Sequence, residues 1–141
     1  MTPSTIYRRW GDLQELLSDV VVERLRPETA PEEHGDLPSD LTAWAEQFPD
    51  EMASPADRAY IRDALPGGPD GGNTGQCSDY AAEQIAVILG RASERGEAAP
   101  GVETVIDHVV TPLMYRILFR PEGLDASYAR RPVASADRAR A

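Results

Sequence analysis

The segment from Glu103 to Arg120 constrains the fold most, because its apolar side chains cover nearly the whole circumference of a helix. A helix that is apolar on all sides is buried on more than one side. Pro112 lies inside the segment, where it leaves the carbonyl of His108 without its helical hydrogen bond and bends the axis. The apolar residues are Val105, Ile106, Val109, Val110, Leu113, Met114, Tyr115, Ile117, Leu118 and Phe119.

Four other segments have helical patterns, and together they predict an all-α protein. Apolar residues recur at steps of three and four over residues 12–26 and 37–48, and Pro49 ends the second run. Ser54, followed by a proline and by Asp57, starts a helix that ends near residue 65. A further helix covers residues 78–95 and is closed by Gly96. The predicted inward side chains are Leu13, Leu16, Leu17, Val20, Val21 and Leu25 in the first, Leu37, Leu41, Trp44, Ala45 and Phe48 in the second, and Ala81, Ile85, Ile88, Leu89 and Ala92 in the last.

The remaining segments read as loops or as unstructured chain. Residues 27–36 combine prolines, acids and a glycine, and residues 66–75 hold five glycines and two prolines, so neither favours a regular element. The second has neither the alternating acids of a calcium loop nor the Gly-Lys-Ser/Thr of a phosphate loop. Pro132 interrupts the last helical pattern, so residues 132–141 are predicted to form a disordered tail.

Composition and charge limit the classes of protein to consider. No apolar run approaches the roughly 18 residues of a membrane span, and no secretory signal is visible, so the expected location is the cytoplasm. The net charge of −10 argues against a protein that coats nucleic acid over its whole surface. Residues 1–26 nevertheless balance four arginines against four acids, whereas residues 28–70 hold eleven acids against two arginines. This asymmetry suits a DNA-binding head on an acidic body, although a solvated acidic face also explains it.

The first seventeen residues predict two helices with almost no loop between them. Thr2 can cap the first helix, and Pro3 sits at its first position, where the missing N–H costs nothing. Gly11 ends that helix, and Asp12 with Glu15 has the spacing of a capping box for the next.

Three short motifs resemble the tetracycline-repressor (TetR) family of bacterial transcription regulators. The stretch 2–17 is similar to the family's DNA-reading helix and the helix that follows it. Arg-Ala-Ser-Glu-Arg-Gly-Glu at 91–97 and Thr-Pro-Leu-Met-Tyr-Arg at 111–116 resemble family motifs of the regulatory domain, in the family's order. The resemblance implies that the following residues contact DNA: Thr2, Pro3, Ser4, Thr5, Tyr7, Arg8 and Arg9.

Two features depart from the family pattern. Leu13 stands where the family usually has a lysine that contacts a phosphate, and the sequence begins at the recognition helix itself. A helix-turn-helix needs another helix to hold the recognition helix in the major groove. We therefore expect a true or ancestral form with about 35 more residues upstream of Met1, which would supply those supporting helices.

The resemblance also implies an effector pocket and a dimer interface in the regulatory domain. Family members bind small molecules between the helices of that domain, although core packing is the alternative role for each candidate residue. The segment resembling the family's dimer helix lies within residues 103–120. The pocket candidates are Trp44, Phe48, Tyr60, His108, Met114 and Tyr115, and the interface candidates are Val105, Val109, Leu113 and Ile117.

Catalytic and metal chemistry find little support in the sequence. Cys77 would need His34 or His108 beside it to act as a nucleophile, and no third orienting group can be named. Two histidines 74 positions apart give no metal-ligand spacing. We therefore expect neither an enzyme nor a cofactor.

Together these observations predict an all-α protein with residues 1–26 as a partial DNA-binding head and residues 36–131 as a regulatory and dimerisation domain. The implied function is that of a ligand-responsive repressor with an incomplete helix-turn-helix. Its expected partners are a double-stranded DNA operator, a small-molecule effector and a second copy of the chain, with no membrane. The alternative is a dimerisation or ligand-sensing module that no longer binds DNA, and a third possibility is an enzyme.

Overall fold

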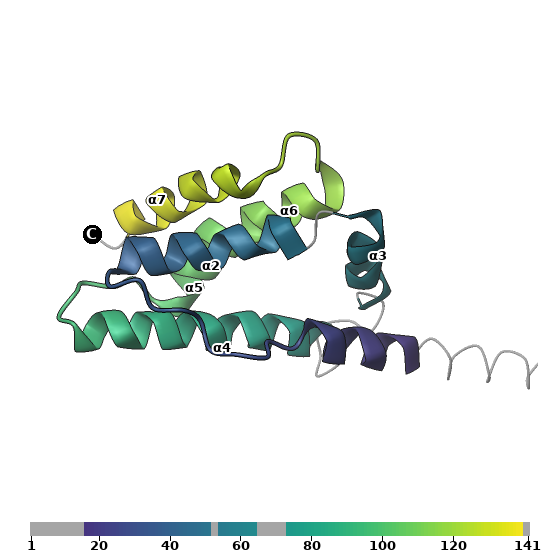
Figure 1. Cartoon of the computed structure of the whole chain (residues 1–141), viewed down its shortest axis with the longest axis horizontal. Coiled ribbons are helices and arrows are strands. Elements are labelled where there is room, and N and C mark those ends of the chain that lie inside the picture. The colour runs from purple at the N-terminus through teal and green to yellow at the C-terminus, as the bar shows by residue number, and fades with distance from the viewer. Residues whose placement is uncertain (1–15, 52–53, 65–72, 140–141) are drawn as a thin grey trace, which may run out of the picture. The chain divides into compact units, whose positions relative to one another are not determined.

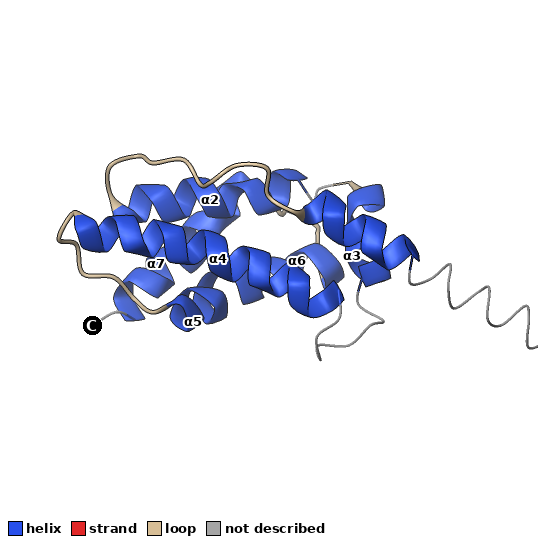
Figure 2. Ribbon diagram, turned by 90° about the horizontal axis from the view of Figure 1, so that it is seen from below, coloured by secondary structure: helices blue, strands red, loops and turns tan. Residues whose placement is uncertain are grey.

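Every regular element in the described part of this computed structural model is helical, and no strand occurs among those residues (Figures 1 and 2). The structure describes residues 16–51, 54–64 and 73–139. The all-α prediction is therefore confirmed. The predicted DNA-contacting residues, Thr2 to Arg9, lie outside the described residues.

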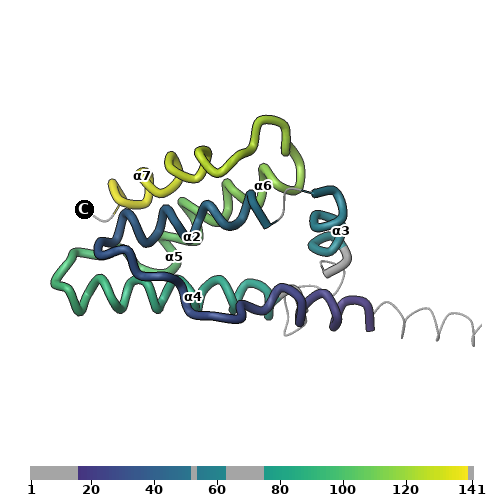
Figure 3. Tube along the Cα trace, viewed as in Figure 1, coloured from purple at the N-terminus to yellow at the C-terminus, as the bar shows by residue number. Residues whose placement is uncertain are grey.

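The helices follow one another along the chain with few long connections (Figure 3). The first covers residues 16–25 within the described part. The others are α2 (Leu37–Glu51), α3 (Pro55–Ala64), α4 (Asn73–Glu94), α5 (Val102–Val105), the π turn η2 (Ile106–Val110), α6 (Thr111–Phe119), the 3-10 turn η3 (Ala126–Ala129) and α7 (Arg130–Ala139).

Two helix boundaries differ from the prediction. Pro49 does not end α2, which continues to Glu51. Pro49 is buried, and this packing outweighs the one helical hydrogen bond that its missing N–H removes. Asn73 begins α4 inside the glycine-rich segment, five residues before the predicted start. The start of α3 is as predicted, since the backbone N–H of Asp57 donates to Ser54 Oγ at 3.1 Å.

The contacts divide the chain into two compact units, which we describe separately. The described residues of the first unit are 16–27, 59–64 and 73–80, and those of the second are 28–51, 54–58 and 81–139.

The first unit buries Val21, Val22, Ile61 and Tyr80. The predicted apolar stripe of its first helix is only partly correct, because three of its members are exposed on the surface. They are Leu16, Leu17 and Val20.

In the second unit, α2, α4, the α5–α6 segment and α7 enclose a single apolar cluster. Figure 1 shows α2 and α7 running side by side, and these two helices are also in contact. The buried members of the cluster are Leu37, Leu41, Trp44, Ala45, Ile85, Ile88, Leu89, Ala92, Val105, Val109, Leu113, Ala129, Val133 and Ala136.

The π turn η2 accommodates Pro112, which immediately follows the first residue of α6. The backbone N–H of Thr111 donates to the Ile106 carbonyl, five residues back, and Thr111 Oγ1 donates to the same carbonyl at 3.0 Å. A π turn contains about one residue more than an α turn. The sequence predicted a bend at Pro112 but did not predict this wider turn.

The π turn also aligns the buried face of the α5–α6 segment. Val105, Val109, Leu113 and Ile117 are each 0% exposed, at strict steps of four residues. In an uninterrupted α-helix each such step drifts by about 40°, so the first and last would lie about 120° apart. One extra residue in the π turn removes about 100° of that drift, which leaves all four side chains on one face.

This burial corrects the predicted dimer interface. The four candidates, Val105, Val109, Leu113 and Ile117, are completely buried within one chain. They therefore form core and present no surface to a second chain, so their assignment to an interface is wrong.

Residues 132–139, predicted to belong to a disordered tail, instead form most of α7. Pro132 lies in the first turn of that helix, where a proline is tolerated because the backbone N–H has no helical partner there. Val133 and Ala136 are buried against the core, and this packing explains why the segment is helical.

Candidate functional site

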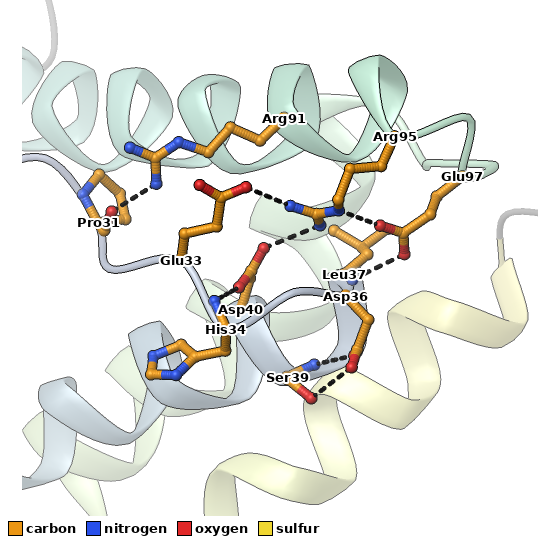
Figure 4. A network of polar contacts seen from close by, with 10 residues as sticks. All are labelled: Pro31, Glu33, His34, Asp36, Leu37, Ser39, Asp40, Arg91, Arg95 and Glu97. Atoms are coloured by element: carbon orange, nitrogen blue, oxygen red, sulfur yellow. Dashed lines mark hydrogen bonds and ion pairs between the residues drawn. The ribbon is translucent and has the colours of Figure 1, made fainter.

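Arg95 connects the end of α4 to the start of α2 through three carboxylates (Figure 4). Its Nη1 lies 3.0 Å from Glu33 Oε1, and its Nη2 lies 3.0 Å from Asp40 Oδ2. Its Nε donates to Glu97 Oε1 at 2.6 Å. We call these four side chains the Arg95 cluster.

Gly96 places Glu97 within reach of Arg95. Its φ of +78° is the left-handed conformation that glycine adopts without strain. The N–H of Glu97 then donates to the Ala92 carbonyl at 2.9 Å, and that of Gly96 to the Ser93 carbonyl at 3.0 Å, which is a Schellman motif. The prediction that Gly96 closes this helix is confirmed.

Glu97 in turn caps α2, because its Oε2 accepts the backbone N–H of Leu37 at 2.8 Å. That hydrogen bond, followed by the one from Arg95, lowers the pKa of Glu97. The hydrogen bond to Glu97 likewise raises the pKa of Arg95. Both groups are therefore held in their charged forms.

Asp40 is the buried member of the Arg95 cluster, with 1% of its side chain exposed. Its Oδ1 accepts the backbone N–H of His34, and its Oδ2 accepts from Arg95. Arg91, one turn before Arg95, donates to the Pro31 carbonyl. The first, fifth and seventh residues of the Arg-Ala-Ser-Glu-Arg-Gly-Glu motif thus hold the loop 28–36 and α2 against α4.

The predicted pocket residues differ in their burial and in their partners. Trp44 is buried in the core and meets Phe48 edge to face, with ring centroids 4.8 Å apart. His108 Nδ1 lies 3.0 Å from Ser135 Oγ on α7. Tyr115 is exposed at the surface of α6. Met114 is half-buried, and Tyr60 belongs to the first unit.

Tyr60 packs against an arginine of its own unit. Arg24 Nη1 donates to the Tyr60 hydroxyl at 3.1 Å, with its guanidinium 4.3 Å from the ring centroid. Arg26 Nε similarly donates to the Tyr80 hydroxyl at 3.2 Å. These two arginines therefore join the end of the first helix to the rest of the unit.

A surface hollow of about 190 Å³ lies beside Trp44. Its volume is below the roughly 300–1,000 Å³ of small-molecule pockets, and Trp44 is the one predicted pocket residue in its lining. The lining residues are Pro31, Glu32, His34, Ala43, Trp44, Glu46, Gln47 and Asp50.

The side of the α5–α6 segment opposite its buried face carries two exposed aromatic rings. Tyr115 is 56% exposed and Phe119 is 68% exposed, and their ring centroids lie 5.2 Å apart. Exposed large apolar groups that touch one another mark candidate interaction surfaces. The sequence reasoning placed Tyr115 in a pocket and missed this surface, because the phase of the helix depends on the π turn.

Among the described residues, no group of three or more histidine, cysteine, aspartate or glutamate side chains is placed to hold a metal ion. None of the helices in the described ranges is both long and apolar enough to cross a membrane. Cys77 is half-buried, and burial raises the pKa of its thiol.

The helical core, closed by the Arg95 cluster, defines the class of the second unit as an all-α domain. Residues 31–136 match the family model described as "Tetracyclin repressor-like, C-terminal domain". Because the match covers most of the chain, the chain belongs to the tetracycline-repressor family of regulators. No curated protein and no solved structure matches the chain.

Proposed function

We propose that this protein is a ligand-responsive, DNA-binding transcriptional repressor that acts as a homodimer in the cytoplasm. The observation that carries the proposal is the match of residues 31–136 to a repressor-like regulatory domain, preceded by a segment that resembles a DNA-reading helix. The second unit would then sense the effector and join two chains, and residues 1–26 would form part of the DNA-binding head.

In this proposal the expected helix of residues 2–10 contacts the operator. Hydroxyl and arginine side chains contact phosphates, and Tyr7 and Arg8 also reach the bases. Apolar Leu16, Leu17 and Val20 are exposed on the helix of residues 16–25, and they offer a surface on which other helices of the DNA-binding head would pack. The proposed contact residues are Thr2, Pro3, Ser4, Thr5, Tyr7, Arg8 and Arg9.

A salt-titrated gel-shift or anisotropy assay tests DNA binding. The probe is the DNA on either side of the coding region, and the proteins are the 141-residue chain and a form extended in frame at its N-terminus. We expect sequence-specific binding that weakens as the salt concentration rises, because arginine side chains that contact phosphates displace counterions from the DNA. Absence of specific binding by both forms would contradict the proposed DNA-binding function.

Two substitutions locate the contact surface. In the extended form, Tyr7→Ala should weaken specific binding by about 1–3 kcal/mol, and Arg8→Ala should also reduce the dependence on salt. The matched control is Arg138→Ala, which removes an exposed arginine from α7. Binding unchanged by both head substitutions would exclude this helix from the DNA interface.

The alternative is a dimeric ligand-sensing module that does not bind DNA. Leu13, at a position where the resemblance calls for a lysine, and the net charge of −10 favour it. Absence of DNA binding by the extended form, together with dimerisation, would select this function.

A further inference from the structure

The loop 28–36, which we call the strap, connects the helix of residues 16–25 to α2 without regular secondary structure. Among its nine residues Pro31 is buried and the other eight are exposed. Because one buried residue supplies little apolar stabilisation, polar contacts hold the strap in place.

Three side chains of α4 donate hydrogen bonds to the strap. They are seven and four residues apart, so they lie on one face of the helix. Their acceptors are alternate residues of the strap, which therefore follows α4 in the same direction, and Figure 4 shows the last two of the three contacts. The contacts are Gln84 Nε2 to the Thr29 carbonyl at 3.1 Å, Arg91 Nη1 to the Pro31 carbonyl at 2.5 Å and Arg95 Nη1 to Glu33 Oε1 at 3.0 Å.

The site that receives the strap does not depend on the strap. Arg95 is also held by Asp40 of α2 and by Glu97, and neither carboxylate belongs to the strap. The strap adds one further contact, from the backbone N–H of His34 to Asp40 Oδ1. Opening of the strap would therefore break a few polar contacts and expose Pro31, and it would leave the apolar cluster unchanged.

We propose that the strap opens from α4 and α2 as one unit while the helical core stays folded, and that Gln84, Arg91 and Arg95 hold it closed. A segment with few buried apolar contacts and exposed hydrogen bonds opens at a lower free energy than the core of the same protein. This inference goes beyond the proposed function, because it requires neither DNA nor an effector.

The strap controls how much free chain joins the helix of residues 16–25 to α2. When it is closed, the chain is fixed to α4 from Thr29 onward. When it is open, nine residues are free, and they can span about 30 Å at about 3.3 Å per residue. Opening therefore converts a short connection into a long one.

Hydrogen exchange of the full chain, followed by NMR at several low urea concentrations, tests the proposal. The reporter is the backbone N–H of His34, which is bonded to Asp40 while the strap is closed. The reference is the N–H of Ile88, a buried residue of α4. We expect the protection factor of His34 to be at least about tenfold lower and almost independent of urea, because opening of the strap exposes little surface.

Two kinds of substitution separate opening of the strap from unfolding of the core. Arg91→Met and Gln84→Ala should each lower the protection of His34 by about two- to tenfold, because each removes one hydrogen bond of the closed strap. Ile117→Val should lower the protection of Ile88 by about two- to tenfold and leave that of His34 unchanged, because the core is folded in both states of the strap.

The matched controls are Arg138→Met, at an exposed arginine of α7, and Glu83→Ala, at the exposed residue before Gln84. Both should leave the protection of His34 within about twofold of wild type. Equal protection and equal urea dependence of His34 and Ile88, or loss of His34 protection in Ile117→Val, would overturn the separate opening. An unprotected His34 would overturn the closed strap, and indifference of His34 to both α4 substitutions would overturn the assignment of the residues that hold it. These outcomes do not depend on DNA binding, so they are distinct from a failure of the proposed function.

Discussion

Replacing Asp40 with asparagine should destabilise the fold far more than its small change in size suggests. The carboxylate accepts one hydrogen bond from Arg95 and one from the backbone N–H of His34, and it is almost completely buried. An asparagine offers one oxygen and one NH₂ group, so one of those two donors would face another donor. Either orientation of the amide therefore leaves a mismatch inside the protein.

The magnitude follows from the burial of each partner. Removing one member of a buried ion pair costs about 3–5 kcal/mol, and a lost hydrogen bond to a charged group about 1.5–3 kcal/mol. Arg95 keeps Glu33 and Glu97 as partners and remains partly solvated. We therefore expect Asp40→Asn to lower the free energy of unfolding by about 3 kcal/mol, at the lower end of the range for buried ion pairs. For a chain of 141 residues this corresponds to a fall in Tm of about 10 °C.

Urea unfolding followed by circular dichroism measures this difference. The matched control is Glu33→Gln, which makes the same change in another partner of Arg95 that is half-exposed, and it should cost less than about 1 kcal/mol. In an Arg95→Met background the cost of Asp40→Asn should fall by roughly half. A loss below about 1 kcal/mol for Asp40→Asn, or the same loss with and without Arg95, would refute the reasoning.

Four further substitutions test the same unit by urea unfolding. The pKa of Glu97 is lowered from its ordinary 4.5, so the ionised carboxylate stabilises the fold above pH 4.5, and this stabilisation is lost as the pH falls through the folded-state pKa. Glu97→Gln should therefore flatten the loss of stability below about pH 4.5. An unchanged pH profile would contradict this. Gly96→Ala should cost about 1 kcal/mol through its positive φ, whereas Gly90→Ala, inside α4 and equally free of neighbouring atoms, should stabilise slightly; equal effects would exclude a backbone cause. Leu113→Ala should cost about 2–5 kcal/mol, and a smaller loss would show that the core around the π turn repacks.

The positions of the helices could be predicted well where local signals and burial agree. Leu37, Leu41, Trp44 and Ala45 recur at helical spacing, and all four are buried in α2. Two of the errors involve prolines, because the effect of a proline depends on its place in the helix. Pro132 lies in a first turn, and Pro49 in a last turn where tertiary packing keeps it helical.

The sequence identified the motif of the Arg95 cluster but not the contacts that its residues make. The spacing of Arg91, Arg95 and Glu97 identified a family-like segment. Their partners, Pro31, Asp40 and Leu37, lie about 55 to 60 positions away along the chain, at distances that no local pattern can join. In the sequence, Asp40 cannot be distinguished from the other acids of its acidic segment, because its burial is seen only in the structure.

In the segment 103–120, buried residues recur at strict steps of four, and the prediction of an ordinary α-helix did not use this spacing. An amphipathic α-helix alternates steps of three and four so that its apolar face stays aligned. Val105, Val109, Leu113 and Ile117 take three steps of four in succession, with Glu103, Asp107 and Thr111 in a second such row. Successive steps of four stay on one face only if the helix gains about one residue, and Pro112 favours that gain because it cannot supply an α-helical hydrogen bond. The spacing and the proline together therefore predict a π turn, and the π turn determines which side chains the segment leaves exposed.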